Sequence, residues 1–350
     1  MLRSHAVRKY LPAKQAFRTS RGATLGAENV FLAVEQDGML GFGEASPIRY
    51  FGENAADVHM QLLGLADFLK RQTLESVSDI HHIRVEAEKI LSPSRAALCA
   101  VDLALWDLWG KLRHESVAHL LWNEPARPLM TAVTMSVPLP EDVEFRILEL
   151  SAFPMVKVKM DVKADLSVLR KLRDSGVRRL LVDANASWTV EQCRKLLPQF
   201  RDLGVEAVEQ PLPPHLNHEM KSILRDSPLP LLADESCAVP EEVEKMTGLF
   251  SGINIKLVKC GGLSPGLKML EFARRNDLKV MVGCMLESSV LISAGLALAQ
   301  KADWADLDGS WLLAEDPFTG LSFADGILYP SQKPGLGVEL LAHSPGEISL

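Results

Sequence analysis

Short apolar runs, each ending in a charged residue, recur through the second half of this chain at nearly even intervals. Successive charges lie 22 to 26 residues apart, about the length of one strand, one helix and two short loops. The charges are Lys159, Asp183, Glu209, Asp234 and Lys256. Because the carboxyl ends of parallel strands gather at one mouth of a barrel, the five charges are predicted to share one site.

The segment after residue 128 has the pattern of buried strands alternating with helices. Amphipathic stretches such as 165–176 and 189–204 separate the apolar runs. The expected strands cover 131–137, 155–160, 179–186, 205–211, 229–235, 252–259, 278–285 and 304–309. Eight such alternations predict an α/β fold of the (β/α)-barrel type. An open doubly wound sheet usually carries a Gly-rich phosphate loop after its first strand, and this sequence has none there.

The N-terminal part of the chain has a different pattern, with strands first and helices afterwards. Residues 27–36 and 39–47 are expected to form strands joined by a hairpin turn at Asp37-Gly38. Residues 53–72 and 94–112 are expected to form helices. Strands followed by helices indicate a small α+β domain.

Composition argues against several classes of protein. The 350 residues carry a net charge of −7 without a basic stripe, so no nucleic-acid partner is expected. The sequence has no apolar run of about 18 residues and no secretory signal, so we expect no membrane association and a cytoplasmic location. The five cysteines are scattered without a C-x-x-C pair, which indicates reduced thiols.

Three carboxylates, Asp183, Glu209 and Asp234, come from the ends of three consecutive expected strands. Any one of them could instead cap the helix that follows its strand. Three carboxylates at matched places supply the oxygen ligands that Mg²⁺ prefers, with positions left for water or substrate. A magnesium site is therefore expected at this mouth.

Two lysines, Lys157 and Lys159, stand two residues apart and so share one face of their strand. On the outer face they would lie among packing helices, and Val156 and Val158 would fill the barrel. Because burying an unpaired ammonium is costly, two lysines inside a barrel indicate function, and the inner face is favoured. Near a dication the pKa of a lysine falls, so that the amine can act as a base.

The remaining lysine of the series, Lys256, lies four strands after Lys159, on the opposite side of an eight-stranded ring. Two lysines so placed can reach the α-carbon of one bound carboxylate from its two faces. One removes a proton and the other returns one, a 1,1-proton transfer. Lys157 and the metal are expected to stabilise the negative oxygens of the enediolate.

The motifs KVK, DANASW, EQPL, ADES and NIKLVKCGG closely resemble those of the enolase superfamily, in its muconate-lactonizing subgroup. The resemblance covers nearly the whole chain, including GFGEASP, ALCAVDLALWDLWGK and the KPGLGV tail. It implies a modified TIM barrel, (β/α)7β, over residues 126–324. It also implies an α+β capping domain over residues 1–125, to which residues 325–350 return. The roles that it implies are acid/base catalysis by Lys159 and Lys256 and Mg²⁺ binding by Asp183, Glu209 and Asp234.

Members of this subgroup share that core and differ in reaction. Here the eighth strand ends in Asp306 and Asp308, whose two-residue spacing points both acids to one face. This Asp-x-Asp signature is similar to that of the dipeptide epimerases. The resemblance implies that the pair holds the ammonium of a dipeptide whose carboxylate binds Mg²⁺. The alternative is a loop acid followed by a turn at Asp308-Gly309.

Two loops of the capping domain are expected to close over the substrate. Arg21, or otherwise Arg18, could pair with an acidic side chain such as the glutamate of Ala-Glu, although either could be an exposed loop arginine. Tyr50 and Phe51 could shape an apolar pocket or pack between the domains. Arg21 and Arg49 both lie in these loops, which favours an acidic dipeptide.

The expected function is that of an isomerase, a Mg²⁺-dependent dipeptide epimerase. Alternatives are a muconate-type cycloisomerase, an o-succinylbenzoate synthase or a racemase of N-acylated amino acids, whose substrates carry no ammonium for the acid pair. A non-catalytic binding protein is a further alternative, and assembly into a homo-oligomer stays open. Glu287, at the end of the seventh strand, is expected to contact substrate or a lysine, whereas the spacing assigns no role to Lys259.

Overall fold

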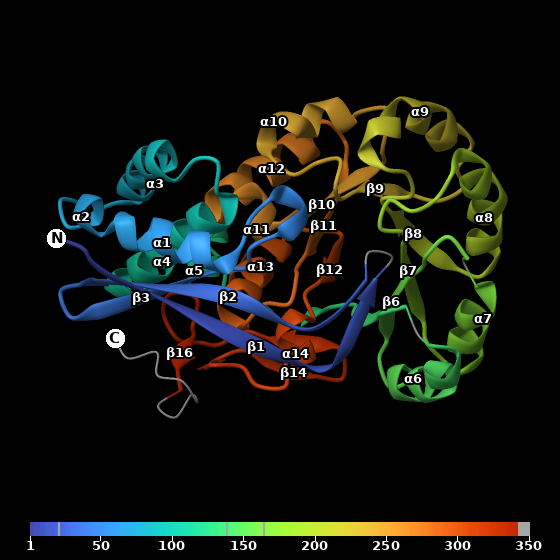
Figure 1. Ribbon diagram of the computed structural model, residues 1–350, viewed down its shortest axis with the longest axis horizontal. Helices are drawn as coiled ribbons and strands as arrows, with labels where there is room; N and C mark the ends of the chain where they lie inside the picture. Colours follow the sequence, from blue (N-terminus) through green and yellow to red (C-terminus); the bar gives the residue numbers. More distant parts are fainter. Residues whose placement is uncertain (20–21, 138, 164, 342–350) are drawn as a thin grey trace.

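The computed structural model describes residues 1–350 except 20–21, 138, 164 and 342–350. Its larger part is a parallel sheet of eight strands in sequence order, which curls into a barrel (Figure 1). The strands are β5 (Val133–Met135), β6 (Met155–Lys159), β7 (Arg179–Asp183), β8 (Val205–Glu209), β9 (Leu231–Ala233), β10 (Gly252–Lys256), β11 (Lys279–Gly283) and β12 (Trp304–Asp306). The first and last strands meet where the Ala132 N–H donates to the Ala305 carbonyl at 2.9 Å. All eight predicted strands are confirmed.

Helices follow the barrel strands and cover the outside of the ring (Figure 1). They are α6 (Val143–Leu150), α7 (Leu166–Asp174), α8 (Val190–Asp202), α9 (Asn217–Asp226), α10 (Pro240–Val243), α11 (Leu257–Cys260), α12 (Leu263–Arg275), α13 (Ser289–Ala299) and α14 (Gly309–Leu312). The helices predicted over 165–176 and 189–204 are confirmed as α7 and α8. No helix in the described part of the chain combines the length and the apolar character needed to span a membrane.

The N-terminal part forms a three-stranded antiparallel sheet with α4 packed on it. A Cβ on Gly43 would lie 1.8 Å from the Ala100 carbonyl oxygen, so glycine is what lets α4 approach the sheet this closely. The elements are β1 (Arg3–Thr19), β2 (Gly22–Gln36), β3 (Met39–Ala45), the 3₁₀ turn η1 (Arg49–Phe51), α1 (Ala55–Gly64), α2 (Ala66–Leu69), α3 (Val77–Leu91), α4 (Arg95–Arg113) and α5 (Val117–Trp122). The predicted α+β arrangement is confirmed.

Local predictions for this part were correct at the turn and incomplete at the helices. Asp37 and Gly38 have positive φ values of 53° and 78°, as the predicted hairpin turn requires. The helix expected over 53–72 is divided at Leu65 into α1 and α2. Helix α3 was not predicted, although the Asp79 carboxylate accepts the Ser76 N–H at 2.8 Å in a capping arrangement that the sequence displays.

The last described residues return to the N-terminal part of the molecule. The Leu336 N–H donates to Asp107 Oδ1 at 2.7 Å, and the Val117 N–H donates to the Gly335 carbonyl at 2.8 Å. The short strands of the remaining segments are β4 (Leu129–Met130), β13 (Phe318–Thr319), β14 (Ser322–Ala324), β15 (Ile327–Tyr329) and β16 (Glu339–Leu340). The tail therefore packs on α4 and α5.

An apolar layer fills the amino-terminal end of the barrel interior. We call it the floor, and its members are Ala132, Met155, Leu181, Ala207, Leu232, Met281 and Trp304. Side chains two residues apart share one face of a strand. Since Met155 belongs to the floor, Lys157 and Lys159 also lie on the inner face of β6, as predicted.

Candidate active site

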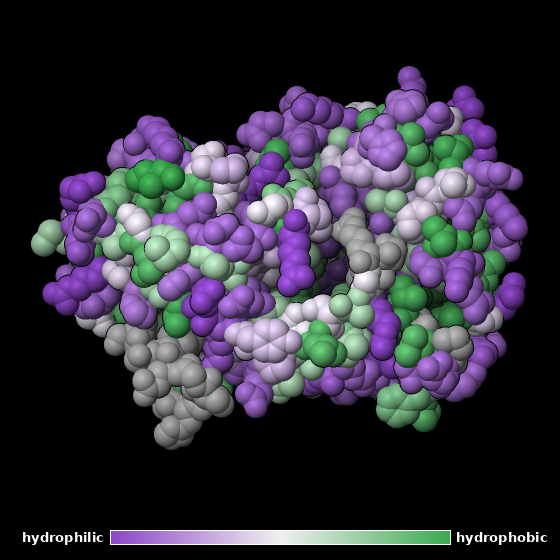
Figure 2. Space-filling model, viewed as in Figure 1, coloured by the Kyte–Doolittle hydropathy of each residue, from purple (hydrophilic) through white to green (hydrophobic). Residues whose placement is uncertain are grey.

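The charged residues predicted from the sequence meet at the carboxyl ends of the barrel strands. Strand pairing places Lys159 opposite Asp183 and Asp183 opposite Glu209, and Lys256 donates to Asp234 Oδ2 at 3.2 Å. The surface is hollowed near the centre of this face (Figure 2), beside the β1–β2 hairpin, which extends toward the barrel (Figure 1). We call the layer of charged residues at the carboxyl ends of the strands the mouth of the barrel.

The innermost cation of the mouth is Lys157, whose side chain is almost completely buried. Its Nζ lies 2.5 Å from Glu209 Oε2, 2.7 Å from Asp306 Oδ2 and 3.3 Å from Asp183 Oδ2. Burial lowers the pKa of Lys157, but Asp306, Glu209 and Asp183 outweigh it and hold the pKa well above the ordinary value. Three carboxylates around one ammonium suit a fixed positive charge.

The other two lysines stand on opposite sides of the ring, four strands apart. Lys159 Nζ donates to Asp183 Oδ2 at 2.7 Å and lies 5.7 Å from the centre of the Phe17 ring. Burial lowers the pKa of Lys256, but Asp234 and then Glu209 raise it more, so that it lies well above the ordinary value. Each lysine thus donates to a carboxylate from the next or the preceding strand.

Asp183, Glu209 and Asp234 are held by hydrogen bonds in the same way. One oxygen of each accepts a hydrogen bond from a supporting group, and the other contacts at least one of Lys157, Lys159 and Lys256. The supporting bonds run from the Asn185 N–H to Asp183 Oδ1 (2.8 Å), from Asn254 Nδ2 to Glu209 Oε1 (2.8 Å) and from Lys259 Nζ to Asp234 Oδ1 (2.5 Å). Each carboxylate is therefore oriented before any ligand arrives.

The three carboxylates Asp183, Glu209 and Asp234 are the oxygen donors available to a metal ion at the mouth. Across the described residues, which omit 20–21, 138, 164 and 342–350, no three acidic, histidine or cysteine side chains lie in an arrangement that could hold a metal ion as they stand. The ammonium of Lys157 lies between Asp183 and Glu209. Burial and the nearby Asp183 nevertheless raise the pKa of Glu209 to about 7, against the opposing effect of Lys157. A cation among these hard oxygen donors would relieve that repulsion, so the residues fit Mg²⁺.

The acid pair at the end of β12 lies beside Lys157. Asp306 Oδ2 is occupied by Lys157, whereas Oδ1 has no hydrogen-bond partner among the described residues. Asp308 Oδ2 accepts the Thr134 N–H at 2.7 Å. Burial and the nearby Asp306 raise the pKa of Asp308 to about 7. A cationic ligand group would remove this repulsion, which is what an ammonium site requires.

The residues predicted to contact the substrate outside the acid pair are Tyr50, Phe51, Glu287 and Arg21. Tyr50 lies near enough to Lys256 to raise the pKa of that lysine, whereas Phe51 packs edge-on against Tyr50 and under the Arg95 guanidinium. Glu287 is buried, and burial and then Glu44 raise its pKa to about 8. The prediction for Arg21 falls outside the described residues.

Sequence reasoning missed several groups that support the mouth. Asn254 stands two residues before Lys256, so the period of two that located the lysines could have located it too. Thr134 and Phe17 carried no such signal, since their contacts with Asp308 and Lys159 join segments far apart in the sequence. Lys259, left unassigned, binds Asp234.

Comparison with known proteins agrees with this geometry. Residues 3–122 match the N-terminal domain of the mandelate racemase / muconate lactonizing enzyme family, and residues 143–344 match the enolase C-terminal domain-like family. The chain belongs to the enolase superfamily. Within this superfamily it is 34% identical over 337 residues to an L-Ala-D/L-amino acid epimerase of Flavobacterium johnsoniae, covering 96% of this chain and 99% of that protein.

Two further proteins show the same likeness. An L-Ala-D/L-Glu epimerase of Escherichia coli is 33% identical over 91% of this chain and 96% of its own. A crystal structure of a dipeptide epimerase from Methylococcus capsulatus, complexed with Mg and L-Arg-D-Lys, superposes with a TM-score of 0.86. It is 29% identical over 96% of this chain and 98% of that chain.

Proposed function

We propose that this protein is a Mg²⁺-dependent dipeptide epimerase that inverts the α-carbon of the C-terminal residue. The observation that carries the proposal is the joint placement of three groups in one mouth. Two lysines stand on opposite sides of the ring, an oriented carboxylate triad lies between them, and a buried acid pair adjoins it. The likeness to epimerases of dipeptides supports the same function.

In this mechanism Lys159 and Lys256 exchange roles with the direction of the reaction. One lysine, as the free amine, takes the α-proton from one face, leaving the electron pair in an enediolate of the substrate carboxylate. The opposite ammonium then gives its proton to the other face, and the carbon is inverted. Lys157 keeps its proton throughout and stabilises the negative oxygens, because three carboxylates surround it.

Mg²⁺ held by Asp183, Glu209 and Asp234 would supply Lewis acidity toward the substrate carboxylate, which makes the α-proton easier to remove. The supporting bonds from Asn185, Asn254 and Lys259 hold those carboxylates in place. The protein thereby avoids reorganising the site during the reaction.

The acid pair distinguishes this reaction from the alternatives. Asp306 and Asp308 would bind the N-terminal ammonium of the dipeptide, through Asp306 Oδ1 and the oxygen of Asp308 not used by Thr134. Substrates of a muconate-type cycloisomerase or an o-succinylbenzoate synthase carry no ammonium, and their carboxylates would be repelled here. We propose an acidic C-terminal residue as the preferred side chain, since arginines lie in both capping loops.

A dipeptide library in D₂O with Mg²⁺ tests the proposal, with mass spectrometry to read a gain of one dalton. We expect deuterium at the α-carbon of the C-terminal residue, in both L,L- and L,D-isomers. Dipeptides with a blocked N-terminus serve as the control, since the acid pair should reject them. Incorporation into blocked substrates alone would favour a racemase of N-acylated amino acids, and none at all would favour the cycloisomerase alternative.

A further inference from the structure

Among the three carboxylates proposed to bind the metal, Asp234 is the one whose supporting hydrogen bond comes from a charged group. Its N–H donates to Gln210 Oε1 at 2.9 Å, and its carbonyl oxygen accepts from Lys259 Nζ at 2.6 Å. Lys259 Nζ also donates to Oδ1 at 2.5 Å, while Lys256 donates to Oδ2 at 3.2 Å. Every polar atom of Asp234 therefore has a partner, and Oδ2 alone is shared with a proposed catalytic lysine.

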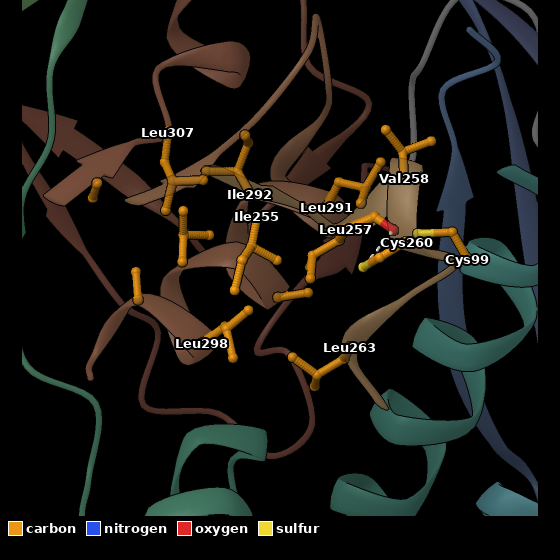
Figure 3. Packing of buried hydrophobic residues seen from close by; sticks show 14 of the residues in the cluster. Cys99, Ile255, Leu257, Val258, Cys260, Leu263, Leu291, Ile292, Leu298 and Leu307 are labelled. Carbon is orange, nitrogen blue, oxygen red and sulfur yellow. Dashed lines mark hydrogen bonds between the residues drawn. The ribbon is translucent and has the colours of Figure 1, made fainter. Parts of the chain in front are cut away.

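The local sequence explains why two lysines meet one acid. Strand β10 ends at Lys256, and α11 makes a single turn before Gly261, whose φ of 90° ends it. Residues three apart lie on the same side of such a turn, so both ammonium groups approach the end of β9. Figure 3 shows Leu257, Val258 and Cys260 among the apolar residues of the core, which anchors the turn around Lys259.

Lys259 itself is completely buried, whereas Lys256 retains some exposure. The ammonium of Lys259 donates hydrogen bonds to the carbonyl oxygen of Asp234 and to its Oδ1, the carboxylate oxygen that does not accept from Lys256. Asp183 and Glu209 have their corresponding oxygens held by neutral N–H groups of Asn185 and Asn254. A charged hydrogen bond is about twice as strong as a neutral one, so Oδ1 of Asp234 is held more firmly than Oδ1 of Asp183 or Oε1 of Glu209.

We propose that Lys259 is a positioning residue that occupies Oδ1 of Asp234 with its own hydrogen bond, so that only Oδ2 is left to bind the metal ion. This inference rests on the proposed metal role of Asp234. A carboxylate restricted to one oxygen leaves more of the octahedral shell of Mg²⁺ for water and substrate. Lys259 acts through Asp234 and takes no proton in the reaction.

The test is direct binding of Mg²⁺ without substrate, measured by isothermal titration calorimetry on the full chain. Lys259→Met keeps the length of the side chain and removes the ammonium, while Asp234 keeps Lys256 as its counter-charge. We expect a loss of about 10- to 100-fold in Mg²⁺ affinity, the usual effect of removing a group that orients a metal ligand. Lys259→Arg, which restores a cation with several donors, should recover part of it.

The matched control is Lys268→Met on α12, an exposed lysine whose removal changes the net charge equally. It should leave the affinity unchanged. A merely structural role would lower the melting temperature of Lys259→Met and leave Mg²⁺ affinity at the wild-type value, and that result would overturn the inference. Tighter Mg²⁺ binding would overturn it as well, because it would mean that Lys259 acts as a competing charge.

Two further outcomes are informative. If Lys259→Met does not fold, Lys259→Gln, which keeps one donor group, is judged by the same affinity criterion. If the wild-type protein binds no Mg²⁺, the proposed metal site fails and the inference fails with it. If the wild type binds Mg²⁺ and the variant binds it equally well, only the inference fails.

Discussion

The floor and the mouth of the barrel are built by the same strands and have opposite chemistry. On β7, Leu181 belongs to the floor and Asp183 to the mouth, and β8 repeats the step from Ala207 to Glu209. A shift of two residues along a strand keeps the side chain inside the barrel and moves it one layer. Both layers are buried. Whether an inward-facing residue of these strands packs in the core or belongs to the candidate site therefore depends on the layer that it occupies.

Burial of charge is tolerated in the mouth because the charges compensate one another. Lys157 contacts three carboxylates, and Asp183 has its pKa held below the usual range because Lys159 and Lys157 outweigh the effect of burial. Such an arrangement adds little to stability, since desolvation offsets much of the attraction. The floor supplies apolar burial without that cost, so changes in the two layers should have separable effects.

The largest expected effect comes from removing a proposed base in the mouth. Lys159→Ala and Lys256→Ala should each reduce epimerisation by at least about 10³-fold, since the proton on one face then has no acceptor or donor. Each variant should still exchange the α-proton of the single isomer that faces the remaining lysine. Both activities are measured by NMR in D₂O.

The control for charge is Lys268→Ala, which changes an exposed lysine on α12. Wild-type epimerisation in either Lys159→Ala or Lys256→Ala would contradict the two-base assignment. Loss of exchange from both isomers in both variants would show that the lysines act together rather than one on each face.

The floor should respond in the opposite way. Leu181→Ala removes a side chain that is 2% exposed and should lower the free energy of unfolding by about 2–5 kcal/mol. The kcat should stay close to the wild-type value, because the floor touches no reacting group. Urea unfolding and steady-state kinetics measure the two quantities on the same preparation.

Leu148→Ala on α6 is the matched control, since that leucine is 74% exposed and its loss should change stability little. If Leu181→Ala lowered kcat more than about tenfold, a factor worth about 1.4 kcal/mol, while stability was unchanged, the division into two layers would be wrong.

A smaller effect is expected at the acid pair. Asp306→Asn should raise KM for dipeptides by about 10- to 100-fold, which corresponds to the loss of one charged hydrogen bond. The effect on kcat should be smaller, because Lys157 keeps Glu209 and Asp183 as partners. Steady-state kinetics with the best dipeptide of the library provides the measurement.

Asp226→Asn is the control for this variant, because Asp226 pairs with Arg225 at the surface of α9. Unchanged kinetics in Asp306→Asn would remove the ammonium site from the proposal. A fall in kcat with constant KM would mean instead that Asp306 acts by orienting Lys157.

The sequence predicted the mouth better than it predicted the capping part of the molecule. Asp183, Glu209 and Asp234 could be located because a strand end and a two-residue period fix where a side chain points. Helix α3 is absent from the prediction although its capping residues stand in the sequence, and the predicted helix over 53–72 runs through the break at Leu65, because the ends of elements are the least reliable part of a sequence-based assignment.

Contacts between distant segments could not be predicted in this way. Asp107 on α4 accepts the Leu336 N–H, and Thr134 donates to Asp308 across the closure of the barrel. Neither pair has a fixed spacing in the sequence, so only the fold reveals them. The same reason left Lys259 unassigned, since its partner lies on the preceding strand.

The smallest expected effect lies where the N-terminal part meets the mouth. The Phe17 ring is centred 5.7 Å from Lys159 Nζ, a contact worth about 0.5–1 kcal/mol at such sites. In a Lys256→Ala background, where only Lys159 acts, Phe17→Leu should slow single-face exchange about two- to fivefold, because the ring no longer holds the Lys159 side chain in position. In a Lys159→Ala background it should leave exchange on the other face unchanged.

Phe145→Leu, on the exposed side of α6, is the control in both backgrounds. Equal slowing on the two faces would mean that Phe17 affects closure of the whole site. Slowing on the Lys159 face alone would show that the N-terminal hairpin influences one proposed base and not the other. The mouth would then be asymmetric because the Phe17 ring influences Lys159 and not Lys256, although both lysines come from equivalent strand ends.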